Sequence, residues 1–159
     1  MAYEEAFAYL QRKGYGDRVQ TFDVSSATVE LAAIAVGTEP ARIAKSLTFM
    51  VEEQPVMILC AGDAKINNGK FKGFFHKKAK MLTAEEVHTL IGHDVGGVCP
   101  FGIKAGVDVY LDESLKRFEK VYPACGSASS AVELTPEELE QLSGSKDWID
   151  VCRIPEEAE

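Results

Sequence analysis

The run Lys45-Ser46-Leu47-Thr48-Phe49-Met50-Val51-Glu52-Glu53-Gln54-Pro55-Val56-Met57-Ile58-Leu59-Cys60-Ala61 decides the fold class. Its two apolar halves, 45–51 and 55–61, are rich in residues that suit strands. The polar residues 52–54 lie between them and are too few for anything but a tight connection. Two strands joined in this way pair antiparallel, so the sequence predicts a β-hairpin here.

Helices are expected on both sides of this hairpin. Apolar periodicity ending at a glycine predicts helices over 3–13 and 28–36. Threonine–glutamate capping boxes, at Thr83 with Glu86 and at Thr135 with Glu138, predict further helices over 84–91 and 136–142.

Short strands complete the pattern, and they are expected at 19–23, 107–111, 120–124, 131–134 and 148–151. Brief connections between neighbouring strands favour an α/β (α+β) fold in which helices surround a mixed, largely antiparallel sheet. The regular βαβ alternation of a dinucleotide-binding domain is not present.

The composition is that of an ordinary globular protein. The 159 residues are 46% hydrophobic and 26% charged, enough for one core without disulfides or metal. No linker, repeat or low-complexity tract occurs, so we expect a single domain over 1–159. No apolar run approaches the roughly 20 residues that cross a bilayer, and the acidic start 1–5 does not resemble a signal peptide. We therefore expect a cytoplasmic protein with no membrane partner.

The cysteines and histidines exclude several kinds of site. Cys60, Cys99, Cys125 and Cys152 form no Cys-x-x-Cys pair, and the three histidines have no metal-ligand spacing. In a reducing compartment we expect the cysteines to be free thiols. The glycines match neither a dinucleotide fingerprint nor a P-loop. The sequence therefore predicts no metal and no cofactor.

The run Gly96-Gly97-Val98-Cys99-Pro100-Phe101-Gly102 is the most informative motif. Three glycines and a proline in seven residues indicate a rigid loop with unusual backbone angles. Such a loop lets a ligand approach the backbone, whose N–H groups can then bind a carbonyl or phosphate oxygen. A plain tight turn between strands explains the same composition.

Lys45 is a charge at the start of an otherwise apolar strand. A lysine at a strand end commonly extends its ammonium into solvent, and this is one interpretation. The other is a fixed ammonium at a cleft that binds an anion such as a phosphate.

A basic segment, 65–80, stands out from a chain whose net charge is −8. It carries six of the 17 basic residues and no acidic residue, and Phe71, Phe74 and Phe75 lie among its lysines. Such a segment can hold a phosphate backbone while aromatic rings stack on bases, which makes Lys65, Lys72 and Lys77 candidate nucleic-acid-binding residues. Equally, the phenylalanines can be core residues and the lysines a solvated face.

Cys99 has two interpretations. A thiol among backbone donors can be an activated nucleophile or a redox sensor, or it can be a small residue that fits the loop. We favour the second, because no histidine partner is evident from local signatures. His93-Asp94 precedes the loop, and an orienting role is open to it.

Several of these segments resemble the YbaK-type family, which includes the editing domain of bacterial prolyl-tRNA synthetases and its freestanding relatives. Lys45–Phe49 resembles the family's strand with its functional lysine, and Gly97–Gly102 resembles its Gly-x-x-Pro-Phe-Gly loop. Asp63–Asn67, and Tyr122–Gly126 running into Val132–Leu139, are similar to further motifs of the family. The matches agree in order and spacing over nearly the whole chain.

The resemblance implies hydrolysis of the ester that joins a wrong amino acid to tRNA, usually proline tRNA carrying alanine or cysteine. Lys45 would anchor the terminal phosphate or ribose, and backbone N–H groups up to Gly102 would stabilise the oxyanion, so both are candidate catalytic residues. Water, or a hydroxyl or thiol of the substrate, would attack. The implied substrate contacts are Phe22, Ser46, Gly97, Val98, Cys99, Pro100, Phe101, Gly126 and Ser127.

The implied partners are the acceptor end of mischarged tRNA and, as a candidate, prolyl-tRNA synthetase. No synthetase catalytic or anticodon domain is evident, so a freestanding, trans-acting editor is expected. Phe22 replaces a tyrosine of the cysteine-removing relatives, and 125–130 lacks their basic character, which weakens the case for a cysteine substrate. A non-catalytic tRNA- or synthetase-binding module is the alternative, and a redox protein using Cys99 is a third.

Overall fold

The predicted hairpin forms the centre of the fold. In the computed structural model, which describes residues 2–155, β2 (Ile43–Val51) and β3 (Gln54–Ala61) pair antiparallel along their lengths. Glu52 and Glu53 make the turn with φ of 48° and 68°, the positive values that a tight two-residue hairpin loop requires. Residues 56–61 of β3 are buried, because both faces of this strand are covered.

The hairpin belongs to a five-stranded sheet of order β6-β2-β3-β5-β8. The added strands β6 (Tyr122–Pro123), β5 (Asp108–Asp112) and β8 (Trp148–Ile149) each pair parallel with their neighbour. The long β2–β3 pairing is antiparallel. The mixed α/β fold with surrounding helices is therefore confirmed.

Two small antiparallel sheets lie outside the main one. β1 (Val19–Thr21) pairs with β7 (Ser130–Val132), and β4 (Lys65–Ile66) pairs with β9 (Cys152–Arg153). Each joins segments far apart in the sequence: the first ties the N-terminal part of the chain to its C-terminal part, and the second ties the C-terminal part to the middle.

Helices occur where the capping residues predict them. They are α1 (Ala2–Arg12), α2 (Val29–Val36), α4 (Ala84–Glu86) and α5 (Pro136–Ser143). Both capping boxes have their two reciprocal hydrogen bonds. The helix expected over 84–91 is α-helical only to Glu86 and continues as one π-helical turn, η3 (Val87–Ile91). Short 3-10 helices occupy Gly16–Arg18, Pro40–Arg42 and Glu113–Arg117.

One helix, α3 (Asn68–Phe75), was not predicted. The Asn67 side chain caps it, and it lies within the basic segment. Phe71 is fully buried, with its ring 5.0 Å from that of Phe49 and 4.6 Å from that of Phe75. Stacking on bases is therefore wrong for Phe71, whereas Phe75 is partly buried against the core and Phe74 is 43% exposed. Lys70 and Lys72 of this helix are both exposed, and the Lys70 ammonium donates to Asp150 and to the Cys152 carbonyl oxygen, each at 3.0 Å.

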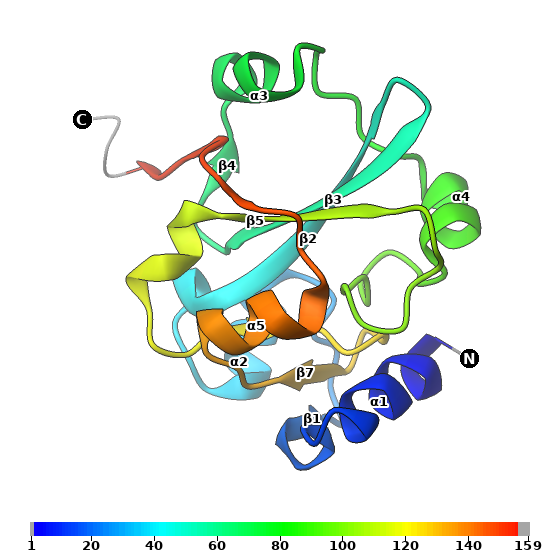
Figure 1. Ribbon diagram of the computed structural model, residues 1–159. Coiled ribbons are helices and arrows are strands. Elements are labelled where there is room, and N and C mark those ends of the chain that lie inside the picture. The colour runs from blue at the N-terminus through cyan, green and yellow to red at the C-terminus, as the bar shows by residue number, and fades with distance from the viewer. Residues whose placement is uncertain (1, 156–159) are drawn as a thin grey trace.

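Helices and small strands lie at two opposite ends of the molecule (Figure 1). α3 lies at the top, level with the turn of the β2–β3 hairpin, whereas α1 and the β1–β7 pair lie at the bottom with α5 above them. α4 covers one side between them. No helix within residues 2–155 is both long and apolar enough to span a bilayer.

Candidate functional site

A cleft of about 280 Å³ opens beside the start of β2. Its walls come from five segments of the chain, which fall within 26–32, 43–48, 81–87, 95–98 and 122–131. Most of the lining is apolar, and it includes no acidic side chain. It is therefore a small, mostly apolar hollow with a few polar groups, the usual character of a ligand site.

Lys45 and Ser46 both border this cleft, as expected of a functional strand. The Lys45 ammonium lies 3.4 Å from the Gly62 carbonyl oxygen, and the side chain is half-buried. No carboxylate within residues 2–155 forms an ion pair with it. The charge of Lys45 is therefore not neutralised by a neighbour and is available to an anionic ligand.

The first part of the glycine loop forms another wall of the cleft, through Gly96 and Val98. Gly97 lies between them but is buried against the neighbouring loop, so that a Cβ there would come within 2.6 Å of the Ser127 nitrogen. Its own amide donates to the Asp94 carbonyl oxygen at 3.0 Å and is not free for a ligand. The amide of Val98, by contrast, has no acceptor within the part of the chain that the structure describes.

The second part of the loop anchors it to α1. Phe101 is fully buried with its ring 6.3 Å from that of Tyr9, and a Cβ on Gly102 would come within 2.7 Å of the Glu5 carbonyl oxygen. Pro100 and Gly102 border a different hollow, shared with α1. This geometry does not support the expected catalytic role of Gly102 or substrate contact through Pro100 and Phe101. Gly96, which was not among the candidates, takes the place at the cleft.

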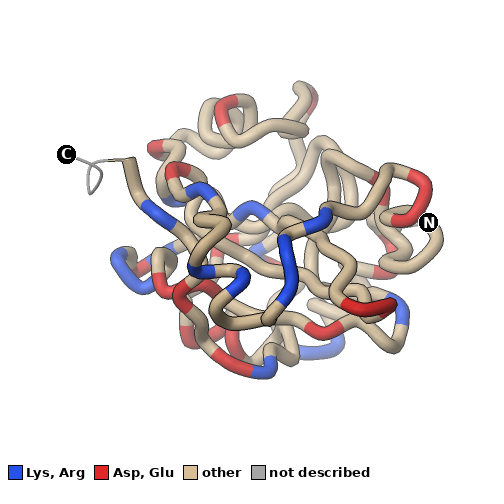
Figure 2. Tube along the Cα trace, turned by 90° about the horizontal axis from the view of Figure 1, so that it is seen from above, with Lys and Arg blue, Asp and Glu red and all other residues tan. Residues whose placement is uncertain are grey.

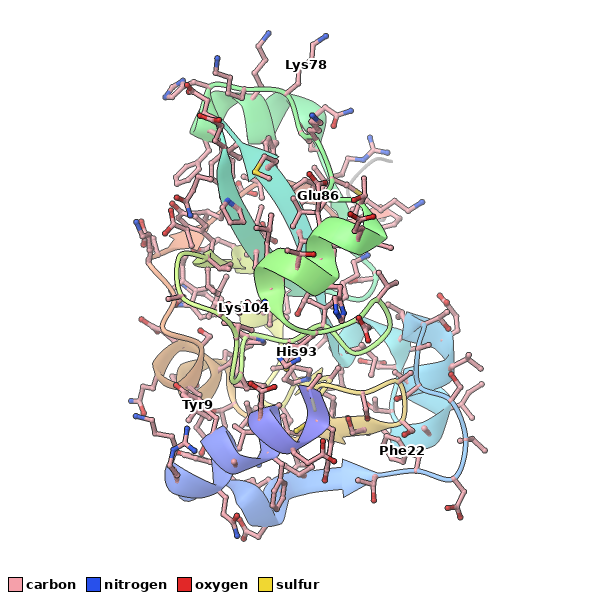
Figure 3. All side chains as sticks on the ribbon, turned by 90° about the vertical axis from the view of Figure 1, so that its right-hand side faces the viewer. Tyr9, Phe22, Lys78, Glu86, His93 and Lys104 are labelled. Carbon is pink, nitrogen blue, oxygen red and sulfur yellow. The ribbon has the colours of Figure 1, made fainter. Side chains whose placement is uncertain are left out.

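Cys99 faces the interior beside His93, a pairing that sequence reasoning missed. The His93 Nε2 lies 2.7 Å from the Phe101 carbonyl oxygen and 3.4 Å from the Cys99 sulfur. Figure 3 places His93 inside the molecule, between the α4 region and α1. Burial lowers the pKa of His93 and raises the pKa of the Cys99 thiol well above its usual range, so both groups are neutral at pH 7. Cys99 is fully buried and does not line the cleft, so the structure does not favour it as a nucleophile or as a substrate contact.

The remaining predicted contacts surround the cleft without lining it. Phe22 is half-buried beyond the end of β1, and its amide donates to the Ser129 carbonyl oxygen at 2.9 Å. Figure 3 shows it past the tip of β1, inside the loop that leads to α2. Gly126 is buried against the start of α1, and the Ser127 hydroxyl lies 2.8 Å from that of Ser130. Gly126 and Ser127 therefore support the loop at Gly97.

Two buried hydroxyls in the cleft wall have no hydrogen-bond partner within residues 2–155, those of Ser26 and Ser46. An unpaired buried hydroxyl is uncommon because it loses its hydrogen bonds to water. Ser46 was a candidate from the resemblance. Ser26 was missed, since a serine after a short strand carries no distinctive signal.

The candidate nucleic-acid-binding lysines lie away from this cleft. Lys65, Lys72 and Lys77 are all exposed, and the Lys77 ammonium lies 4.0 Å from a Glu52 carboxylate oxygen. Figure 2, viewed from the α3 side, shows lysine and arginine positions across the middle of this face. Met81, which follows the basic segment in the chain, borders the cleft.

No group of three or more His, Cys, Asp or Glu side chains within residues 2–155 could hold a metal ion. All four cysteines are buried free thiols. Burial raises the pKa of Cys125 to about 12.

The fold closely matches those of two solved structures. One is described as "a putative trans-editing enzyme for prolyl tRNA synthetase", with a TM-score of 0.86 and 31% identity over 96% of this chain and 97% of that one. A second structure, of hypothetical protein APE2540, matches with a TM-score of 0.83 and 25% identity over 94% and 99%.

The chain belongs to the aminoacyl-tRNA editing domain family, whose family model matches residues 23–142. It is 56% identical over 136 residues to uncharacterized protein YwhH of Bacillus subtilis (strain 168), covering 85% of this chain and 87% of that protein. It is 32% identical over 101 residues to the proline–tRNA ligase of the same strain. That match covers 63% of this chain but only 18% of the ligase.

Proposed function

We propose that this protein hydrolyses the ester bond of mischarged tRNA in the cytoplasm, with proline tRNA carrying alanine or cysteine as the first candidate substrates. One observation carries the proposal: an unneutralised lysine and Val98, whose amide has no acceptor within residues 2–155, border the same small cleft in an editing-family fold. The likeness to part of a proline–tRNA ligase and to a protein described as a trans-editing enzyme supports the choice of tRNA and of action in trans.

The dimensions of the cleft suit the aminoacyl end of the substrate. About 280 Å³ is at the small end of ligand sites, a size that suits an amino acid and its ester group. A synthetase discriminates amino acids that differ by a methylene by only about 1–3 kcal/mol, so small wrong amino acids require a second, hydrolytic site. A small cleft of this kind would admit them.

Two groups supply the binding and the charge stabilisation. The Lys45 ammonium would hold the ribose or phosphate next to the ester. The Val98 amide would donate to the ester carbonyl oxygen as that oxygen gains negative charge in the tetrahedral intermediate. This role moves the oxyanion donor from the far end of the loop to its beginning, because Gly97 already donates to Asp94 and Gly102 contacts α1.

The attacking group would be water or a hydroxyl or thiol of the substrate itself. Cys99 is fully buried and does not line the cleft, and the neighbouring His93 is neutral and hydrogen-bonded to a carbonyl oxygen. The basic segment would hold tRNA phosphates at a distance from the chemistry, through Lys65, Lys72 and Lys77.

The test is deacylation of a panel that includes alanyl-, cysteinyl- and prolyl-tRNA, each on proline tRNA. We expect hydrolysis of at least one mischarged species, and Lys45→Ala should lower kcat/KM at least tenfold, or about 1.4 kcal/mol. Lys146→Ala is the matched control, because Lys146 is an exposed lysine that does not line the cleft. Tight tRNA binding without hydrolysis of any species would instead favour the non-catalytic binding module.

A further inference from the structure

Two large apolar side chains stand exposed at the cleft. Met81 is 58% exposed and Val95 is 68% exposed, yet both border the same hollow as Lys45. They come from different segments, Met81 bridging to Phe49 of β2 and Val95 directly preceding Gly96. We call this pair the apolar rim. Isolated exposed apolar residues are ordinary on a protein surface, but two at the mouth of one cleft mark a place for an apolar ligand group.

The position of the ester in the cleft determines which part of the substrate reaches this rim. If the ester lies beside Lys45 and Val98, the larger nucleoside that carries it extends toward the exposed side chains that border the cleft, Met81 and Val95. That nucleoside has a polar part, the ribose and its phosphate, and a flat apolar part, the face of the base. Lys45 attracts the phosphate and ribose, which leaves the base to the apolar surface.

We propose that Met81 and Val95 form a binding surface for the terminal nucleobase of the aminoacylated strand. This inference rests on the proposed function and adds a base-binding subsite to it. A methionine thioether packs well on an aromatic face and adapts to its position, and a valine adds a rigid apolar contact. The base gains this contact by removing apolar area from water, without any base-specific hydrogen bond.

The chain offers a matched control for this surface. Ile34 on α2 is 76% exposed and apolar, but it does not line the cleft. Replacing Ile34 by serine changes the exposed apolar area of the protein in the same way as the rim substitutions. It should have no effect on substrates.

The experiment compares two small esters and one large one. The alanyl ester of adenosine contains the base, the alanyl ester of 1-O-methylribose lacks it, and alanyl-tRNA is the full substrate. We expect the wild-type protein to prefer the adenosine ester over the ribose ester by at least about fivefold in kcat/KM. The double variant Met81→Ser/Val95→Ser should hydrolyse the two small esters within about twofold of each other, with the ribose ester unaffected.

For alanyl-tRNA the double variant should raise KM and leave kcat nearly unchanged, because the rim binds ground state and transition state alike. Ile34→Ser should retain the wild-type preference. A wild-type protein that hydrolyses the tRNA ester without preferring the adenosine ester overturns the inference, and so does an equal loss on both small esters.

Concentration-dependent dimerisation that disappears in the double variant would assign the rim to a second copy of the chain and also overturn the inference. If the wild-type protein hydrolyses no mischarged tRNA in the panel, the proposed function itself fails.

Discussion

His93 Nε2 lies 2.7 Å from the Phe101 carbonyl oxygen, and this contact ties together the two ends of the glycine loop. A carbonyl oxygen only accepts, so Nε2 carries the hydrogen and Nδ1 is the unprotonated nitrogen of a neutral ring. Nδ1 is buried and has no hydrogen-bond partner within residues 2–155. Protonation of this nitrogen would put an unpaired N–H and a charge into the protein interior.

This arrangement makes stability depend on pH. Burial lowers the pKa of His93 in the folded state, so at acid pH the unfolded chain binds a proton that the folded chain resists. The contribution is complete above the ordinary histidine value of 6.5 and is lost as the pH falls below it. We expect the urea midpoint to fall between pH 7 and pH 5 less steeply in His93→Gln than in the wild type.

Carboxylates titrate in both proteins and cancel in this comparison. His76→Gln changes an exposed histidine, and its urea midpoint should fall with pH as steeply as that of the wild type. If the urea midpoints of the wild type and His93→Gln fell equally with pH, His93 would have the same pKa in the folded and unfolded states.

Cys99 should be dispensable for hydrolysis. Its thiol is fully buried and its pKa is raised, so almost no thiolate forms at pH 7. Cys99→Ala should retain most of the deacylation rate, and iodoacetamide should not inactivate the folded wild type. An acyl-thioester trapped on Cys99, together with loss of hydrolysis in Cys99→Ala, would refute this.

Gly97→Ala should damage the loop where it contacts the neighbouring one. The new methyl group would come within 2.6 Å of the Ser127 backbone nitrogen, which cannot move aside as a side chain would. We expect deacylation to fall at least tenfold, because Val98 shifts with Gly97. Gly73→Ala is the control: no atom lies within 4 Å of its Cβ position on α3, and it should be active and slightly more stable. Full activity of Gly97→Ala would show that the position of the loop at Gly97 and Val98 does not matter for hydrolysis.

Salt should weaken tRNA binding through the basic segment. Two or three phosphate contacts to single-stranded nucleic acid predict a slope of log K against log salt of about −1.4 to −2. Lys72→Ala/Lys77→Ala should flatten the slope and weaken all tRNAs alike, since phosphates carry no sequence information. Lys116→Ala/Lys146→Ala removes the same charge elsewhere and should leave the affinity nearly unchanged. An unchanged slope with altered amino-acid preference in the Lys72/Lys77 variant would place the segment at the acyl site instead.

The N-terminal cap of α5 should contribute measurably to the free energy of unfolding. The Thr135 hydroxyl accepts from the Glu138 amide at 3.1 Å, and the Glu138 carboxylate accepts from both the Thr135 amide and Arg18. The Arg18 hydrogen bond holds the pKa of Glu138 below its usual range. Thr135→Ala should lower the free energy of unfolding by about 0.5–2 kcal/mol in a urea titration. A change below about 0.3 kcal/mol would mean that Glu138 and Arg18 hold the helix start without the threonine.

Local chemistry made much of this fold predictable. The hairpin, the capping boxes and the glycine helix ends each depend on residues a few positions apart, so their signals are complete within a short stretch of sequence. Helix α3 was missed because glycines at 69 and 73 lower its helix propensity, and its stability comes from Phe71 in the core.

The site was less accessible to sequence reasoning. The resemblance indicated Lys45, Ser46 and the glycine loop, but composition does not tell which end of a loop faces a cleft, so Gly102 was chosen where Gly96 is the lining residue. His93 approaches Cys99 because the loop turns back on itself, and the periodicity of apolar residues in the sequence does not predict such a turn.

The cleft walls are drawn from segments that begin at Ser26 and end at Ala131, so most of the chain must be in place before the cleft exists. During synthesis, β2 and β3 can pair as soon as both have emerged, but the wall that includes Ser130 arrives about 70 residues later. Hydrolysis would therefore begin only at the end of folding. The rate of ester cleavage would therefore measure how much of the chain has folded completely. A fragment that stops before Ala131 should have no hydrolytic activity.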